Sequence, residues 1–244
     1  MLRRFVSLLG VCCGAVMIAF FCRTFLFTLF TVPQTDKQPV FLQGDRVLVD
    51  RWAYGFRFPN TSLFGYHRWG KGIPRNGDWA VFNSPLVEHG APPDTSALCM
   101  GMVMACPGDT VWMGRDGKVG RFRDYACGRI WPIAVPARGA YVQVAPWAAR
   151  IYQQTLDLHE TDSANLLPAT SFESIQNGNP IRVRFSRNYY WISSGSEDNL
   201  FDSRTFGFVP EEFFLGKVRN VFYSIQPDAP WQKAWRSDRF LLPI

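Results

Sequence analysis

An uncharged apolar run lies near the start of the sequence. It covers 18 residues, Phe5 to Cys22, and follows the basic start Met1-Leu2-Arg3-Arg4. As a helix the run would rise about 27 Å, close to the roughly 30 Å of a bilayer's hydrocarbon core. It therefore predicts a transmembrane anchor within residues 1–23. The two arginines favour a cytoplasmic N-terminus, with the rest of the chain outside.

A cleaved secretory signal is the alternative interpretation of this start. Two features favour a retained anchor. The apolar run is longer than a usual signal core, and Arg23-Thr24-Phe25-Leu26 follows it in place of a small-x-small cleavage site. Arg23 is expected to reach the lipid phosphates at the interface. We therefore expect a protein with a single membrane span.

Short segments of strand-type residues, separated by Gly and Pro turns, fill most of the remaining chain. One stretch, Pro146 to Asp162, differs because its apolar residues follow helical spacing and its first residue is a proline. Between Gly55 and Asp78 we expect a long loop. The predicted strands are Thr24–Val32, Arg46–Tyr54, Trp79–Pro85, Met100–Cys106, Thr110–Val119 with a turn at Asp116-Gly117, Ile181–Ser186, Tyr189–Gly195 and Phe213–Ile225.

These elements predict a mainly β fold with antiparallel strands and a small helical insertion, preceded by the membrane helix. We expect the β domain to comprise residues 24–134 and 181–244. The inserted lobe is expected at residues 135–180.

The composition fits a globular domain, with 47% hydrophobic and 19% charged residues among 244. The net charge of +6 comes from scattered basic residues, with no Lys/Arg run and no recognisable nucleic-acid module. Nucleic-acid binding is therefore disfavoured, whereas anionic lipid remains a compatible partner. No metal or cofactor is expected, because the histidines are isolated and no CxxC pair or Cys/His cluster occurs. We expect surface or loop positions for His67, His89 and His159.

Three of the six cysteines fall inside the predicted anchor, where they serve as small apolar residues. The other three are Cys99, Cys106 and Cys127. Outside the cytoplasm they would meet an oxidising compartment, where one disulfide and one free thiol could form. The sequence leaves their pairing open.

Five short motifs follow the anchor in a fixed order. They are RTFLFTLFTVP, LQGDRVLVDRWAYGFR, RNGDWAVFNSP, ACPGDTV and DSRTFGFVPEEFFLGKV. Together they resemble the bacterial type I signal peptidases, membrane-anchored serine proteases that remove signal peptides from exported proteins. The resemblance covers nearly the whole chain, and Val135 to Glu160 is similar to the lobe of the family's Bacteroidetes members. It implies an inner-membrane protein whose main domain is periplasmic.

The resemblance also implies a mechanism: a serine attacks the peptide bond, a neutral lysine is its general base, and another serine hydroxyl helps hold the oxyanion. Pro33 and Pro39 match the two prolines of the active-site motif. The nucleophile then falls on Asp36 and the oxyanion serine on Gln34. The lysine, six residues before the proline of PGD, falls on Gly101.

The stretch that leads into the fifth motif shows the same pattern. The family's Gly-Asp-Asn-Arg run falls on Ser194-Gly195-Ser196-Glu197, and the serine that orients the lysine falls on Leu200. Lys37 and Met102 replace the Met and Arg that accompany the dyad. The residues expected to carry out catalysis are therefore substituted, whereas the residues expected to hold the fold are retained. The retained residues are Asp202, Ser203, Arg204, Gly207, Val209 and Pro210.

Three rebuilt catalytic sites remain as alternatives. Thr35 could be the nucleophile and Asp36 or Lys37 its base, although Thr35 is one residue out of register and would face the other way in extended backbone. A carboxyl dyad could pair Asp36 with Asp198 or Asp202. The simpler interpretation of Asp36-Lys37 is a solvated pair on a shallow groove. The third alternative combines a histidine with Cys99 or Cys106.

The sequence therefore favours a catalytically inactive signal peptidase homologue. It would bind a signal peptide or other exported segment by strand addition, or accompany an active signal peptidase or the export machinery. A working signal peptidase with a rebuilt site is the alternative, and a purely structural subunit of a membrane complex is a third hypothesis. The expected peptide groove comprises Gln34, Thr35, Asp36, Lys37, Pro39, Met100, Gly101 and Met102.

An aromatic group begins within the second motif and ends before the third. It comprises Trp52, Phe56, Phe58 and Trp69. The resemblance suggests that these rings face the membrane, whereas packing in the protein core is the equally supported alternative.

Overall fold

The computed structural model describes residues 10–18, 26–32, 40–58, 65–86, 96–115, 117–122, 130–160, 181–195, 201–230 and 234–244. Within these ranges the chain is mainly β, with few helices, and every strand pair is antiparallel. The predicted β fold is therefore confirmed.

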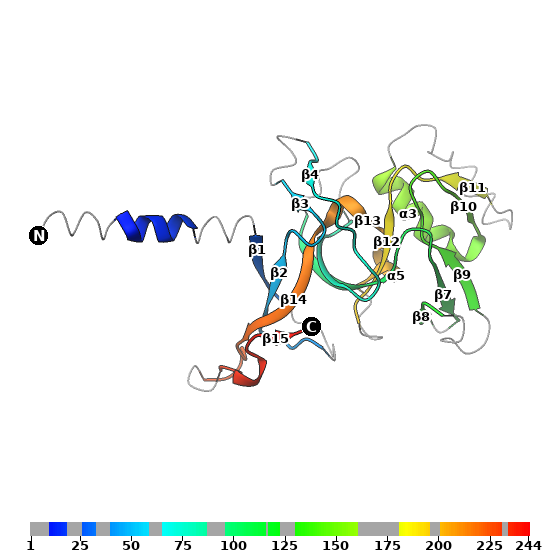
Figure 1. The fold of residues 1–244 in the computed structure, drawn as a ribbon. Helices are drawn as coiled ribbons and strands as arrows, with labels where there is room; N and C mark the ends of the chain where they lie inside the picture. Colours follow the sequence, from blue (N-terminus) through cyan, green and yellow to red (C-terminus); the bar gives the residue numbers. More distant parts are fainter. Residues whose placement is uncertain are drawn as a thin grey trace, which may run out of the picture.

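One bent sheet forms the body of the molecule (Figure 1). Its strand order is β1-β2-β14-β5-β6-β12-β13, with β15 also paired to β14. The long strand β14 binds β2 along one edge and both β5 and β15 along the other. The strands are β1 (Phe27–Thr31), β2 (Asp45–Asp50), β5 (Trp79–Asn83), β6 (Leu98–Ala105), β12 (Tyr189–Ser193), β13 (Val209–Pro210), β14 (Phe214–Ser224) and β15 (Leu242–Pro243).

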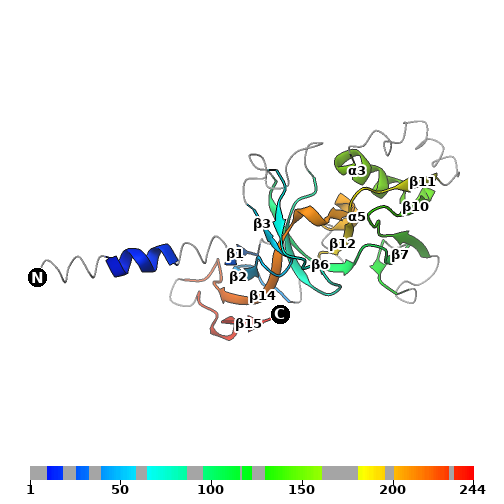
Figure 2. The ribbon, with the colours of Figure 1, turned by 45° about the horizontal axis from the view of Figure 1, so that its top comes forward.

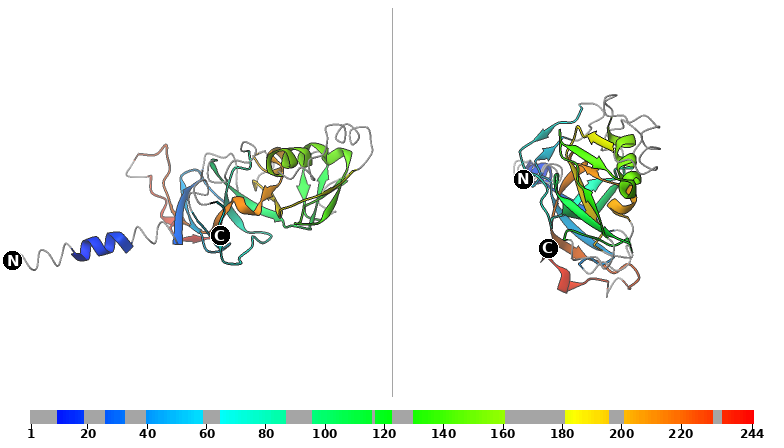
Figure 3. Two further views of the ribbon diagram at one scale, coloured as in Figure 1. Left: turned by 90° about the horizontal axis from the view of Figure 1, so that it is seen from above. Right: turned by 90° about the vertical axis from the view of Figure 1, so that its right-hand side faces the viewer.

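A smaller lobe lies at the end of the molecule opposite β1 (Figures 1 and 2). It contains a three-stranded sheet in the order β8-β7-β9, a two-stranded sheet β10-β11, and one helix, α3. Seen from above, body and lobe follow one another along the long axis of the molecule (Figure 3, left). The elements are β7 (Thr110–Gly114), β8 (Val119–Gly120), β9 (Ile130–Ala134), β10 (Tyr141–Val144), the 3-10 turn η4 (Pro146–Ala148), α3 (Ala149–His159) and β11 (Ile181–Arg184).

Strand β6 separates two layers of the core because its side chains alternate between the two faces of the sheet. On one face, Cys99 and Val103 pack in a cluster with Phe82 and Ile192. On the other face, the methionines at positions 100 and 102 pack against a second cluster. A third cluster fills the lobe and continues into β12. A side chain at Gly101 would point to the same face as Cys99 and Val103, toward the cluster that contains Phe82 and Ile192.

Most predicted strands are confirmed, with shifts of one to four residues at their ends. The predicted loop between Gly55 and Asp78 instead contains the two-stranded pair β3 (Phe56–Arg57) and β4 (Arg68–Trp69). The strands β9 and β10 were not predicted. The prediction for His159 was wrong: its ring is buried on α3 and packs edge-on against Phe213, whereas His67 is exposed as expected.

The predicted membrane span lies partly outside the described residues. Residues 10–18 form a helix, and the rest of Phe5 to Cys22, together with Arg23, is not described. No helix in the described part of the chain has both the length and the apolarity of a membrane span.

Candidate functional site

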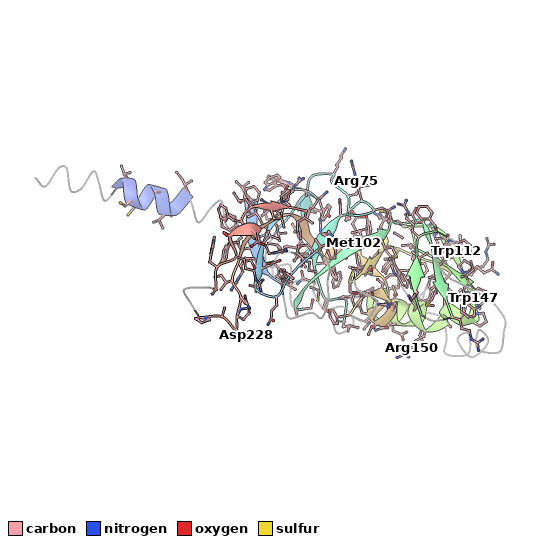
Figure 4. All side chains as sticks on the ribbon, turned by 90° about the horizontal axis from the view of Figure 1, so that it is seen from below. Arg75, Met102, Trp112, Trp147, Arg150 and Asp228 are labelled. Atoms are coloured by element: carbon pink, nitrogen blue, oxygen red, sulfur yellow. The ribbon has the colours of Figure 1, made fainter. Side chains whose placement is uncertain are left out.

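The structure describes only part of the predicted peptide groove. Residues 34–37, Pro39 and Leu200 lie outside the described ranges, as do Glu197 and Asp198. Met100, Gly101 and Met102 follow one another in β6, near the middle of the molecule, where Figure 4 labels Met102. The structure therefore describes the surroundings of Gly101, where the resemblance expects the general base.

No room for a side chain exists at Gly101. A methyl group built on its Cα would overlap the Cγ2 atom of Ile192, and would lie 3.0 Å from the carbonyl oxygen of Ser193 and 3.6 Å from Cε1 of Phe82. Ile192 and Phe82 are both almost fully buried. Because protein cores are close-packed, even one added methyl would require the neighbours to move. The position expected for a lysine is thus filled by apolar neighbours.

The retained scaffold motif holds Ile192 in this position. The backbone N–H of Ile192 donates to the Oγ atom of Ser203 at 2.8 Å, inside the core. Ser203 begins α5 (Ser203–Phe206), and Asp202 caps that helix by accepting from the N–H of Arg204. The motif Asp202-Ser203-Arg204 therefore connects α5 to β12 and fixes the residue that packs against Gly101.

Asp202 itself is committed to this scaffold. Its carboxylate accepts from the Arg204 guanidinium, with an Nη2–Oδ2 distance of 2.9 Å, and from the N–H of Ser194 at 3.4 Å. The carboxylate is almost completely buried. An aspartic dyad with Asp36 would require Asp202 to exchange these bonds for a shared proton, which makes the dyad unfavourable.

The cysteines do not supply an activated nucleophile in the described part of the chain. Cys99 and Cys106 are both free thiols there, and Cys127 is not described. Burial raises the pKa of the Cys99 thiol to about 11. The pKa of the Cys106 thiol is also raised, mainly by burial and to a smaller extent by the negative charge of Asp109. Both sulfurs stay protonated at neutral pH and are weak nucleophiles.

A lysine does lie two strands from Gly101. Lys217 on β14 is paired with Ala80 on β5, and Ala80 is paired with Gly101. However, the Lys217 amine donates to the Asp78 carboxylate at 2.6 Å, and Tyr54 donates to the other oxygen of Asp78 at 3.1 Å. Burial and Asp78 raise the pKa of Tyr54. Lys217 therefore belongs to a hydrogen-bonded network with Asp78 and Tyr54.

Among the described residues, one edge of β6 has no pairing strand beside Gly101. Along the other edge, Ser84 donates to Ala97 and the N–H of Val103 donates to Asp78, so the odd-numbered residues of β6 bond toward β5. Backbone groups alternate in direction along a strand, so those of Leu98 and Met100 face the opposite edge. Strand β12 covers that edge only from Met102 onward, and no other described strand pairs there.

The aromatic group of residues 52–69 is divided between the core and the surface. Trp52 and Trp69 are exposed, whereas Phe56 is buried. Trp52 stacks on Phe56, which contacts Phe58, which contacts Trp69. The phenylalanines thus attach two exposed tryptophans to the β domain.

Comparison with known proteins decides the family. The model of the family described as signal peptidase, peptidase S26, matches residues 4–223, most of the chain. The chain belongs to this signal peptidase family. It is 23% identical over 237 residues to signal peptidase I of Buchnera aphidicola subsp. Schizaphis graminum, covering 86% of this chain and 72% of that protein. It is 22% identical over 228 residues to signal peptidase I of Aquifex aeolicus, covering 86% and 80%.

A third relative, signal peptidase I of Haemophilus influenzae, is 23% identical over 260 residues, covering 93% of this chain and 72% of that protein. Membership of the signal peptidase family agrees with the resemblance stated from the motifs. Sequence reasoning nevertheless missed Ile192 and Phe82, because neither carries chemistry. Their signal is the pairing of Phe82 with Cys99 and of Ile192 with Val103, the residues two positions on either side of Gly101, which only the folded sheet defines.

Proposed function

We propose that this member of the signal peptidase family has lost catalysis and binds exported peptides as an added strand on the open edge of β6. The observation that supports the loss most directly is the packing of Ile192 against Gly101. A lysine general base must stand free and neutral beside the nucleophile. At position 101 a side chain of any size would displace core residues held by Ser203.

The replaced nucleophile supports the same proposal. In the alignment of motifs Asp36 takes the place of the serine and Gln34 that of the oxyanion serine. An ionised carboxylate close to a substrate carbonyl would disfavour an oxyanion there. The vacated dyad thus comprises Asp36 and Gly101, with no catalytic residue assigned.

The open edge of β6 supports peptide binding. Strand addition uses backbone hydrogen bonds for affinity and side-chain pockets for selectivity. Leu98 and Met100 supply the backbone groups, and the Met100 and Met102 side chains form an adaptable apolar surface beside them. The ligand class that fits is an extended, apolar segment such as the end of a signal peptide.

The proposed location is the outer face of the inner membrane. Residues Phe5 to Cys22 would form the anchor, with the N-terminus cytoplasmic and the β domain periplasmic. Exposed apolar side chains gather on β1 and around the C-terminus, as a surface that meets lipid would require. They include Phe27, Leu29, Trp235, Phe240, Leu241 and Leu242. An active signal peptidase or the export machinery is the proposed companion, and residues 135–180 the proposed Bacteroidetes-like lobe.

A working peptidase with a rebuilt site is the second candidate, favoured by family membership itself. It would cleave through Thr35 or Asp36. Its prediction differs from the first in one measurable respect, which is turnover of a substrate by the unmodified protein.

The test uses the full chain in mild detergent and an internally quenched peptide with an Ala-x-Ala cleavage site. We expect binding without cleavage, and protection of the Leu98 and Met100 amides from hydrogen exchange. Met100→Pro should abolish binding because it removes an edge N–H, whereas Met100→Ala should retain it. Cleavage by the unmodified chain that is lost on Thr35→Ala or Asp36→Asn would establish the rebuilt peptidase instead.

A restoration series tests the role of the packing. Asp36→Ser with Gly101→Lys should remain inactive, because Ile192 occupies the space at position 101. Adding Ile192→Ala gives that lysine room, so any recovered turnover should appear only in the triple variant. Turnover by the double variant would contradict the argument from packing.

A further inference from the structure

In the described part of the lobe, a second strand edge has no pairing strand and lies beside a cavity of about 530 Å³. The cavity lies between β9 and β10, which follow one another in the chain but belong to different sheets. Figure 4 labels Trp147, which lines it, near the end of the lobe and far from Met102. We propose that the edge of β10 binds an extended segment of a partner protein that alternates acidic and aromatic side chains.

The β9 side of the cavity is closed to strand addition. Pro132 has no N–H, and its carbonyl accepts from the indole Nε1 of Trp147 at 3.2 Å. The carbonyl of Ala134 accepts from the hydroxyl of Tyr152 at 2.6 Å. Prolines and capped backbone groups are devices that prevent a strand edge from pairing. β9 can therefore form only a wall.

The β10 side is open. Phe185 exchanges hydrogen bonds with the turn before β10, accepting from Gly139 and donating to Ala140. Backbone groups alternate in direction along a strand, and Ala140 bonds toward Phe185. In the register of β10 and β11, Val142 and Val144 therefore also direct their backbone groups toward β11. The backbone groups of Tyr141 and Gln143 therefore face the cavity, and no described residue bonds to them. Two residues of an added strand could each form hydrogen bonds there.

The two faces of β10 define the side chains of the occupant. On the inner face the cavity is apolar, with Val142 and Tyr152 as buried lining and Trp147, 47% exposed, as its rim. A strand presents alternate side chains to this face, and aromatic or large aliphatic ones fit it.

The outer face is basic. The guanidinium groups of Arg182 and Arg184 lie 5.9 and 6.0 Å from the ring centre of Tyr141, which is 64% exposed. No carboxylate in the described part of the chain forms an ion pair with either arginine. The strand positions between the aromatic ones should therefore carry Asp or Glu, which gives the alternating pattern.

The probe is the fluorescein-labelled peptide Ser-Glu-Phe-Glu-Val-Ser, acetylated and amidated at its ends, and the protein is the full chain in mild detergent. Fluorescence anisotropy should show saturable binding, with new hydrogen-exchange protection of the Tyr141 and Gln143 amides. A peptide with Lys in place of both Glu, and one of the same composition with the order Ser-Phe-Glu-Glu-Val-Ser, are the controls. Both should bind at least about tenfold more weakly.

Matched variants separate strand addition from simple charge attraction. Gln143→Pro removes one edge N–H that β11 does not use, and should weaken binding about tenfold, whereas Gln143→Ala should change it less than about threefold. Met100→Pro, on the edge of β6, should have no effect, so the result is independent of the proposed signal-peptide site. Thermal unfolding checks that each variant is folded.

Three results of the binding measurements would overturn the proposal. They are absence of saturable binding by the Glu/Phe peptide, equal binding of the Lys peptide, or unchanged affinity in a folded Gln143→Pro variant. Protection at Leu98 and Met100 in place of Tyr141 and Gln143 would likewise assign the peptide to β6 and overturn it.

Discussion

Replacing Gly101 by alanine tests the central structural argument, because it adds only one methyl group to a filled space. That methyl would overlap Cγ2 of Ile192 and lie 3.0 Å from the Ser193 carbonyl oxygen. Insertion of a methyl group into a well-packed core costs about 1–3 kcal/mol. A backbone oxygen lies on one side, and on the other lies the buried side chain of Ile192, whose backbone N–H is bonded to Ser203. Both leave little freedom to relax, so we expect the upper half of this range.

A double-mutant cycle identifies the cause of the loss. Ile192→Ala removes Cγ2 and, as a buried truncation, should cost about 2–5 kcal/mol by itself. Together with Gly101→Ala it should cost at least about 1 kcal/mol less than the sum of the two single changes, because the new methyl then occupies vacated space. Gly101→Ala combined with Val183→Ala, in the core of the lobe, is the additive control.

Urea unfolding of the full chain in mild detergent, followed by tryptophan fluorescence, measures these differences in the free energy of unfolding. Additive losses at positions 101 and 192 would refute the direct contact. A Gly101→Ala variant as stable as the parent would refute the filled space, and with it the structural reason for an absent base.

Three further predictions concern the surrounding scaffold. Ser203→Ala leaves the buried N–H of Ile192 without its acceptor and should lower the free energy of unfolding by about 1–3 kcal/mol in the same urea assay; an unchanged value would show that this bond does not fix β12. Burial raises the pKa of Asp109, but hydrogen bonds, the largest from Asn76, outweigh it and hold that pKa below 3.8. The hydrogen bond from Asn76 to the ionised Asp109 carboxylate therefore stabilises the fold above pH 3.8, and this stabilisation is lost as pH falls through the folded-state pKa. Asn76→Ala should lower the free energy of unfolding most at neutral pH and progressively less toward pH 2. Cys99, with its pKa raised to about 11 by burial, should react slowly with iodoacetamide at pH 7 and faster as pH rises, with mass spectrometry as the readout; rapid labelling at pH 7 would contradict its burial.

The sequence predicted the body of the fold well because its strands carry a clear signal. Runs such as Trp79–Pro85 and Phe213–Ile225 are apolar, β-branched or aromatic, and turn residues bound them. The pair β3-β4 was missed because each strand has only two residues, too few for any periodicity. β9 was missed because Pro132 lies in its middle, a residue that edge strands alone tolerate.

The end of α3 shows a different limit. The helical pattern predicted a helix to Asp162, but the helix ends at His159, and Glu160 turns inward. Its carboxylate accepts from the N–H of Ser186 and the hydroxyl of Tyr189. A partner 26 residues away in the chain therefore overrides the local preference, and no local pattern contains that information.

For the candidate site, the sequence predicted positions along the chain but not their neighbours in space. Motif spacing identified Gly101 and the scaffold residues, since those positions are set along the chain. Ile192 reaches Gly101 because β12 pairs with β6 in a register that shifts between Trp191 and Ile192. Such a bulge moves every later side chain relative to the neighbouring strand, and the sequence of one strand does not reveal it.

The alternation of β6 explains how catalysis could be lost while a peptide edge is kept. Gly101 directs its backbone groups toward β5 and its missing side chain toward Phe82 and Ile192. Leu98 and Met100 direct their backbone groups the opposite way, to the open edge. In the proposed function, a change of side chain at position 101 removes a base without altering any hydrogen bond that an added strand would use. The proposed loss of catalysis and the proposed peptide binding therefore depend on different residues of one strand and can be separated by substitution.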